Sequence, residues 1–234
     1  RCRNLLRLRQ QSESVKQRAL SLEQRLLASR LDLEERERET LSRLARAIEF
    51  RHTGTTVYLE RMACIAELIA QGLGLSEDVV RGIGLAAPLH DIGKIAMPDS
   101  LLLKPGPFDK SERQRMQHHP EIGYRLLEGS HNRFIQISAK IARHHHENYD
   151  GTGYPDGLVG KEIPIEARIV TVADVFDALI SPRPYKKSFS VERALDVITH
   201  QSGKMLDPEC VKALLNALPK LREICERHSR VDPQ

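Results

Sequence analysis

The first 53 residues of this chain contain neither glycine nor proline. Because these two residues are the usual interruptions of an α-helix, we predict one long helix over residues 5–48. Apolar side chains recur in it at seven-residue spacing, at Leu20, Leu27, Leu41 and Ile48, with Glu34 interrupting the stripe. This spacing is typical of a coiled coil and therefore of a dimer. A single solvated helix, or a helix packed on its own domain, are the alternatives.

Beyond Gly54, segments with helical periodicity alternate with glycine and proline. Helices are predicted over Val57–Leu73, Pro120–Leu127, Phe134–His146, Ile165–Leu179 and Val191–Thr199. The segment Pro98–Phe108 predicts a loop, and Asp109 or Ser111 is expected to cap the helix that follows. The glycines and prolines of residues 148–164 indicate an ordered loop or small hairpin. With 4% aromatic residues and no Trp, the apolar residues suit packed helices, so the predicted fold is all-α.

These patterns divide the chain into a linker helix over residues 1–46, a helical domain over 47–225 and a tail over 226–234. The linker holds 12 Lys/Arg against 7 Asp/Glu, and the remainder holds 24 against 25. Because duplex nucleic acid requires a basic face on the folded domain, this distribution argues against such a partner. The chain has no signal-peptide pattern, no long apolar span and no CxxC pair, which predicts a cytoplasmic protein without membrane insertion.

Histidine is concentrated in one part of the domain, since seven of the ten histidines fall between residues 90 and 146. Six of them stand in three groups, at His90, at His118–His119 and at His144–His146. Carboxylates accompany them at Asp91, Asp150, Asp174 and Asp177. Imidazole and carboxylate without thiolate suit Fe, Mn, Zn or Ni. Because adjacent helical residues point about 100° apart, His118 and His144 are expected to face away, with a ligand role as their alternative.

Longer motifs surround these residues. Residues 90–94 read His-Asp-Ile-Gly-Lys, and residues 145–155 contain His-His-Glu followed by Asp-Gly-Thr-Gly-Tyr-Pro. Together with residues 173–179 and 183–186, these blocks resemble the HD-GYP family of the HD phosphohydrolase superfamily over residues 47–215. The resemblance implies an HD-type helical domain with a small GYP loop and a binuclear metal site that hydrolyses cyclic di-GMP.

The resemblance also assigns roles to individual residues. It places one metal ion on His90, Asp91 and Asp174, and a second on His119, His145 and His146, with Asp91 bridging the two. It places Lys94 beside the scissile phosphate, makes Asp177 an orienting residue of the catalytic set, and places Gly153 and Tyr154 in the loop that shapes the substrate pocket. Arg183 and Lys186 are expected to bind phosphate or guanine, with a solvated basic turn as the alternative.

The chain departs from the family pattern ahead of the His-Asp doublet. The position of a metal-binding His in many HD proteins is Tyr58 here, and a Glu found in members with a third metal is Gly54. These departures predict a binuclear rather than a trinuclear site.

The resemblance finally implies partners and competing functions. The segments 47–51 and 174–185 are most similar to output domains of two-component response regulators, so an upstream receiver domain, its sensor kinase and GGDEF diguanylate cyclases are the expected protein partners. Hydrolysis to pGpG, with GMP as a further product, is the leading hypothesis. A degenerate domain that acts as a cyclic di-GMP receptor or docking module is the first alternative, and a general HD nucleotide phosphohydrolase is the second.

Overall fold

The structure, a computed structural model, describes residues 2–52, 57–181 and 188–229. Within these ranges it contains helices and no strand, which confirms the predicted all-α class. The α-helices are α1 (Cys2–His52), α2 (Val57–Gly72), α3 (Glu77–Ala86), α4 (Asp99–Leu102), α5 (Lys110–Met116), α6 (His119–Leu127), α7 (Arg133–His144), α8 (Ile165–Ile180), α9 (Val191–Gln201), α10 (Pro208–Asn216) and α11 (Leu218–Ser229). The 3₁₀ helices are η1 (Ala87–Leu89), η2 (Ile92–Ala96) and η3 (Gly160–Glu162).

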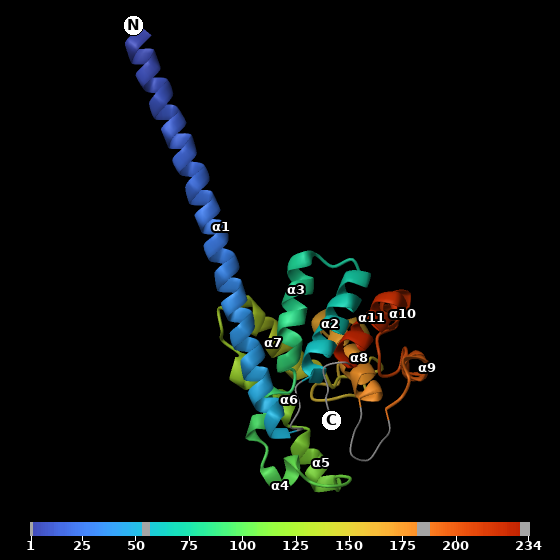
Figure 1. Cartoon of the computed structure of the whole chain (residues 1–234). Coiled ribbons are helices and arrows are strands. Elements are labelled where there is room, and N and C mark those ends of the chain that lie inside the picture. Colours follow the sequence, from blue (N-terminus) through green and yellow to red (C-terminus); the bar gives the residue numbers. More distant parts are fainter. Residues whose placement is uncertain (1, 53–56, 182–187, 230–234) are drawn as a thin grey trace. The chain divides into compact units, whose positions relative to one another are not determined.

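The predicted long N-terminal helix is present as α1, which Figure 1 shows as one continuous helix. The chain divides into two compact units, Arg1–Thr40 and Leu41–Gln234. In the first unit the stripe leucines are solvent-exposed, with Leu20 58% and Leu27 60% exposed. In the second unit Leu41 and Ala45 are buried, because the last turns of α1 join the core of the helical domain.

The core of the helical domain is built around α2 and α8, two helices with few charged residues. Met62 and Ile69 of α2 and Ile169 and Phe176 of α8 are fully buried. The α2 helix contacts α3, α8, α10 and α11, so it is covered on several sides, which explains its apolar sequence. Burial of each large side chain contributes about 1.5–3 kcal/mol, and this packing fixes α2 and α8 as the frame of the site.

A short helix within residues 98–108 corrects the loop prediction. The segment contains α4, whose residues Leu101 and Leu102 are buried with Met97 in a small cluster separate from the main core. Apolar burial therefore orders a turn of helix between proline and glycine. The next helix begins as predicted: Asp109 is the N-cap of α5 and accepts a hydrogen bond from the backbone N–H of Glu112.

Residues 148–164 form the predicted ordered loop. Asp150 and Val159 make one antiparallel bridge across it, without a named strand. The loop follows α7, whose N-cap Asn132 accepts hydrogen bonds from two backbone N–H groups of the first turn. Among the described residues, no helix combines the length and apolar character needed to cross a membrane.

Candidate metal centre

Five of the six predicted ligands lie at the ends of helices, and the sixth lies within one. His90 and Asp91 occupy the turn between η1 and η2, and His119 is the first residue of α6. His145 and His146 directly follow α7, while Asp174 lies within α8. A helix end allows a side chain to project from a rigid element without the crowding of a mid-helix position, so this arrangement brings ligands from four segments to one place.

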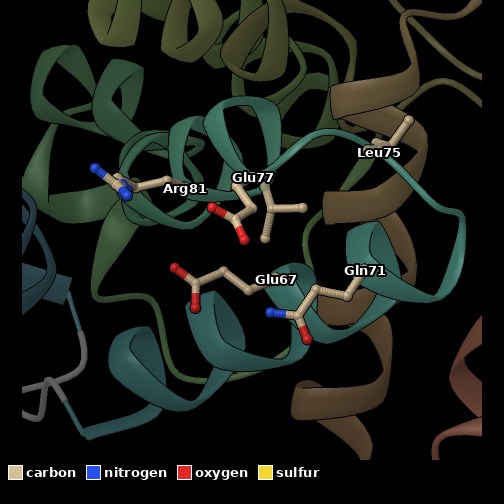
Figure 2. Close-up of a pocket in the computed structure, with 6 residues that line it drawn as sticks. Glu67, Gln71, Leu75, Glu77 and Arg81 are labelled. Atoms are coloured by element: carbon tan, nitrogen blue, oxygen red, sulfur yellow. The ribbon is translucent and has the colours of Figure 1, made fainter.

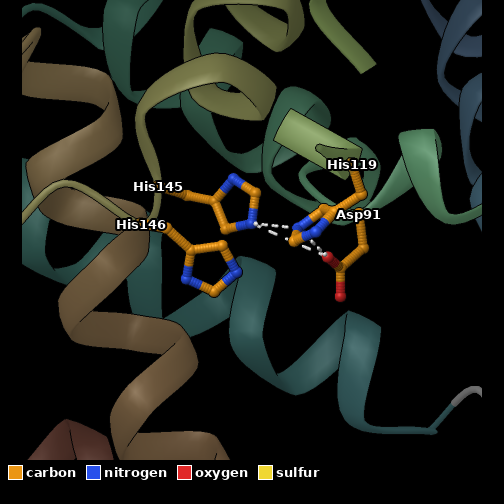
Figure 3. Close-up of side chains that lie close together, drawn as sticks. All are labelled: Asp91, His119, His145 and His146. Carbon is orange, nitrogen blue, oxygen red and sulfur yellow. Dashed lines mark hydrogen bonds and ion pairs between the residues drawn. The ribbon is translucent and has the colours of Figure 1, made fainter. Parts of the chain in front are cut away.

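Four of these residues converge closely, as Figure 3 shows. Asp91, His119, His145 and His146 each offer a ligand atom, and these atoms all lie within 4.8 Å of one another. Oδ1 of Asp91 is 3.2 Å from Nε2 of His119 and 3.6 Å from Nε2 of His145. The structure thus places the predicted second-metal ligands together around one oxygen of Asp91.

The other oxygen of Asp91 faces His90 and Lys94. Oδ2 is 3.2 Å from Nε2 of His90 and 2.5 Å from the Nζ atom of Lys94. Nε2 of His90 is in turn 3.9 Å from Oδ1 of Asp174. One oxygen of Asp91 thus faces His119 and His145, and the other faces His90 and Lys94, so each oxygen has a predicted ligand beside it, as a bridging carboxylate would.

Three of the rings are oriented by hydrogen bonds to backbone carbonyl oxygens. Their Nδ1 atoms lie 2.7–3.1 Å from the oxygens of a preceding turn: His90 to Ala87, His119 to Met116 and His145 to Ile141 and Ala142. A carbonyl oxygen can only accept, so each Nδ1 carries a proton, and each Nε2 is directed into the centre, where it offers a lone pair to a cation when it is deprotonated.

These lone pairs fit a cation. The Nε2 atoms of His119 and His145 are 3.2 Å apart, so two electron-rich atoms face each other without a proton between them. Oδ1 of Asp91 is buried and has no hydrogen-bond partner among the described residues. Buried polar groups are otherwise nearly always satisfied, and a divalent ion would satisfy all three atoms at once.

The pKa values of the histidine rings are shifted in different directions. Burial lowers the pKa of His145 to about 4, and burial together with the charge of His145 holds the pKa of His146 well below its usual range. Both rings are therefore neutral ligands at pH 7. Burial alone would also lower the pKa of His90, but the Asp91 carboxylate outweighs it and raises that pKa to about 9.

The Asp91–Lys94 pair also shifts both of its members. Burial would raise the pKa of Asp91, but the ammonium of Lys94 and the ring of His90 hold it well below its usual range. Burial would likewise lower the pKa of Lys94, but Asp91 raises it. Residue i+3 of a 3₁₀ turn lies over residue i, so η2 directs both groups to one side.

Gly93 allows the two ligand-bearing segments to approach. A Cβ atom on Gly93 would lie 1.9 Å from the carbonyl oxygen of His119 and 2.6 Å from the backbone nitrogen of Gly123. The backbones of η2 and α6 are thus in direct contact, and this contact sets the separation of Asp91 and His119. The glycine of the His-Asp-Ile-Gly-Lys motif is required by space at this position.

The other predicted site residues have different placements. Tyr154 stacks on His146 with ring centroids 4.9 Å apart, and a Cβ on Gly153 would lie 2.2 Å from the backbone nitrogen of Asn148. Asp177 is engaged by Arg61, 2.6 Å from Oδ1 to Nε, and it accepts from Ser181 rather than from any histidine of the centre. Arg183, Lys186 and Gly54 lie outside the described residues.

The neighbouring histidines stand apart from the centre. His118 is exposed, and its Nδ1 lies 4.0 Å from the carboxylate of Glu121. The ring of His144 instead lies 3.2 Å from the carboxylate of Asp156. Neither belongs to the group that could hold an ion among the described residues.

Two buried carboxylates near the centre escaped the sequence analysis. Glu49 of α1 is 3% exposed and accepts a hydrogen bond from the hydroxyl of Tyr58. Its position four residues after buried Ala45 was an available signal, because it places a charge on the core-facing side of the helix. Glu147, which is 2% exposed, accepts hydrogen bonds from three backbone N–H groups of the loop.

A separate pocket of about 410 Å³ lies between α2 and α3. Figure 2 shows Glu67 and Gln71 of α2 across from Glu77 of α3. The residues that line the pocket are Glu67, Gln71, Leu75, Glu77, Val80 and Arg81. None of these residues belongs to the metal-binding group.

A helical domain in which histidine and aspartate side chains converge is typical of HD metal-dependent proteins. The model of the HD domain family matches residues 21–210, and the chain belongs to this family. It is 64% identical over 98% of its length to the cyclic di-GMP phosphodiesterase response regulator RpfG of Xanthomonas campestris pv. campestris, covering 61% of that protein. These matches confirm the HD-GYP resemblance.

Two further comparisons agree. The chain is 43% identical over 83% of its length to a cyclic di-GMP phosphodiesterase of Thermotoga maritima, covering 53% of it. The fold is similar to a cyclic GMP-AMP-specific phosphodiesterase of V. cholerae, with a TM-score of 0.61 and 20% identity over 84% of this chain and 54% of that one. The chain thus spans little more than half the length of the relatives it matches.

Proposed function

We propose that this chain is the catalytic part of a phosphodiesterase that opens cyclic di-GMP to linear pGpG, with GMP as the product of a second cleavage. The observation that carries the proposal is the carboxylate of Asp91, whose two oxygens face separate ligand sets. A shared carboxylate is typical of two-metal phosphoester hydrolysis. The names of the relatives supply the substrate class.

We propose two ligand sets, which the grouping of Asp91, His119, His145 and His146 supports. His90, Asp91 and Asp174 would hold one ion, and Asp91, His119, His145 and His146 would hold the other. Two divalent ions, when bound, supply Lewis-acid stabilisation of the phosphate and a nucleophile at neutral pH. Imidazole and carboxylate donors favour Fe or Mn, with Zn and Ni as further candidates.

The residues of the chain have separate tasks in this reaction. The ammonium of Lys94 lies at the bridging carboxylate, where it neutralises negative charge that develops on the phosphate. Gly153 and Tyr154 shape the wall beside His146. Asp177 acts at a distance, by holding α8, and with it Asp174, against α2. Arg183 and Lys186 are proposed as the phosphate- or guanine-binding pair.

The wider setting is also proposed from the relatives. RpfG is named a response regulator, and this supports an upstream receiver domain and sensor kinase, with GGDEF diguanylate cyclases as further partners. We place the protein in the cytoplasm, with residues 1–46 as the linker to the receiver domain and 47–225 as the catalytic domain.

Dimerisation through α1 completes the proposal. Leu20 and Leu27 are more than half exposed, and a parallel second copy would cover them. Sedimentation of Leu20→Gln/Leu27→Gln, with Gln17→Ala/Gln24→Ala as a control on the same helix, should show monomer only for the leucine variant. A dimer of unchanged strength would exclude this stripe as the interface.

Product analysis tests the enzymatic function. The metal-loaded chain is incubated with cyclic di-GMP or cyclic GMP-AMP, and the products are separated by chromatography. Appearance of pGpG supports the proposal. Binding of intact cyclic di-GMP without turnover at any metal loading would instead establish a receptor, and cleavage restricted to simple nucleotides would establish a general HD phosphohydrolase.

A further inference from the structure

His146 differs from the other histidines of the centre in how its ring is held. The rings of His90, His119 and His145 are fixed by hydrogen bonds from Nδ1 to backbone carbonyls. Within the described part of the chain, His146 makes no hydrogen bond through either ring nitrogen. Outside the cluster, its ring contacts Tyr154, at 4.9 Å between centroids and 26° between planes, a stacked geometry.

Stacking can do what a hydrogen bond does at the other rings. Aromatic pairs contribute about 0.5–1.5 kcal/mol beyond their buried area, and a parallel neighbour restricts rotation of the imidazole about its bond to Cβ. A metal ligand whose ring rotates freely loses part of its affinity to that freedom. The orientation of His146 therefore depends on the place of Tyr154.

Tyr154 is in turn held by the loop that carries it. Its backbone N–H donates to the carbonyl oxygen of His146 at 3.1 Å. Just beyond it, the buried carboxylate of Glu147 accepts from the N–H groups of Asp156, Gly157 and Leu158, at 2.7, 3.2 and 3.1 Å. Glu147 thus folds the loop back onto the segment that bears the ligand.

The close fit of Gly153 adds to this constraint. A Cβ at Gly153 would lie 2.2 Å from the nitrogen of Asn148 and 2.5 Å from the Cα of Glu147. The loop segment before Tyr154 therefore lies directly against the backbone that follows His146. On the far side, Arg143 of α7 binds Asp156 through two hydrogen bonds of 2.8 Å.

We infer that Glu147 and Tyr154 are positioning residues, which orient the His146 ring for metal binding by stacking in place of a hydrogen bond. The inference rests on the proposed two-metal function. In it the aromatic ring of Tyr154, and not its hydroxyl, orients His146. A Tyr154 that served instead as a hydrogen-bonding substrate contact would need the hydroxyl.

Two substitutions at Tyr154 separate these roles. Tyr154→Phe keeps the ring and should bind metal as the unaltered chain does. Tyr154→Leu keeps apolar volume but removes the stack. Loss of an outer group that orients a metal ligand commonly costs about 10- to 100-fold in metal affinity, and we expect that loss here.

Metal binding to the metal-free full chain is measured by Co²⁺ absorption and by calorimetry with Mn²⁺. Ring NMR signals of His146, assigned with a His146→Gln variant, report its mobility directly. Weaker metal binding and a mobile ring in Tyr154→Leu, with normal behaviour in Tyr154→Phe, support the inference. Equal metal affinity in all three chains would overturn it, as would a loss in Tyr154→Phe equal to that in Tyr154→Leu.

Glu147 provides the second test. Glu147→Gln replaces one accepting oxygen with an NH₂ group that cannot accept from a backbone N–H, so metal affinity should fall in the same direction. Glu162→Gln is the matched control, because Glu162 is an exposed residue that accepts from one N–H of the same loop, that of Val159. If Glu147→Gln behaves as the control does, Glu147 has no positioning role.

The outcome is separable from the proposed function. Metal affinity and ring mobility are measured without substrate, whereas hydrolysis of cyclic di-GMP by the unaltered chain is measured in parallel. A chain that binds metal through an oriented His146 but cleaves no cyclic di-GMP would retain the inference and refute the substrate.

Discussion

The buried ion pair between Arg61 and Asp177 offers a demanding test of how the domain holds its site. Nε and Nη2 of Arg61 lie 2.6 and 3.2 Å from the two oxygens of Asp177, and Nη2 also donates to Ser181 at 2.5 Å. The side chains are 10% and 2% exposed. The pair joins α2 to α8 across 116 residues, one turn beyond Asp174.

The expected magnitude follows from this burial. Arg61→Met leaves the Asp177 carboxylate buried without its partner, and such a change costs about 3–5 kcal/mol. For a chain of this size each kcal/mol lowers Tm by about 2–4 °C, so Tm should fall by about 6–20 °C. Arg61→Met/Asp177→Leu removes both charges and should recover most of that stability, because buried pairs can be replaced by apolar residues.

Urea denaturation, monitored by circular dichroism, measures the free energy of unfolding of each variant. Arg222→Met is the control, since Arg222 pairs with Glu192 at 3.0 Å with both side chains more than half exposed, and its loss should cost less than about 1 kcal/mol. A loss for Arg61→Met no larger than that of the control would show that the buried pair does not stabilise the packing of α2 on α8. If the double variant regains stability but not hydrolysis, the charged pair itself positions the site.

Three further predictions concern the centre. Gly93→Ala places a Cβ 1.9 Å from the carbonyl oxygen of His119, so η2 and α6 must separate by about 1 Å, and such overpacking costs about 1–3 kcal/mol of stability. Calorimetry should then show weaker metal binding. Normal metal binding would mean that this contact does not set the ligand spacing. Lys94→Ala should retain its metals in elemental analysis and lose about 100- to 1,000-fold in kcat, and an unchanged kcat would remove Lys94 from catalysis. Because Asp91 raises the pKa of His90 to about 9, metal uptake at pH 7 must displace its proton; apparent Mn²⁺ affinity should therefore rise from pH 7 to 9, and a flat profile would show that His90 is already neutral.

Much of this site was accessible from the sequence because its signals are local. His90-Asp91 and His145-His146 stand in short motifs, and the absence of glycine and proline through residue 53 was enough to predict α1. The exposed and buried halves of α1 were not distinguishable, because Leu27 and Leu41 share one stripe but meet solvent in one case and core in the other.

The remaining features depend on contacts distant in sequence. Asp177 was expected in the catalytic set, but its partner Arg61 lies 116 residues earlier, and no local pattern links the two. The α4 helix was not predicted because Leu101 and Leu102 are ordered by a small apolar cluster rather than by helical propensity. The role of Glu147 depends on how the loop folds back, which glycine and proline content alone does not specify.

Metal stoichiometry decides whether Asp91 joins two metal sites. The purified full chain and its Asp91→Ala variant are loaded with Mn²⁺ or Fe²⁺, desalted and measured by elemental analysis beside cyclic di-GMP hydrolysis. The unaltered chain should hold two ions and turn over, and Asp91→Ala should lose both ions and all hydrolysis, because each ion depends on one oxygen of this carboxylate. Two ions retained in Asp91→Ala, or loss of one ion only, would contradict the bridging role.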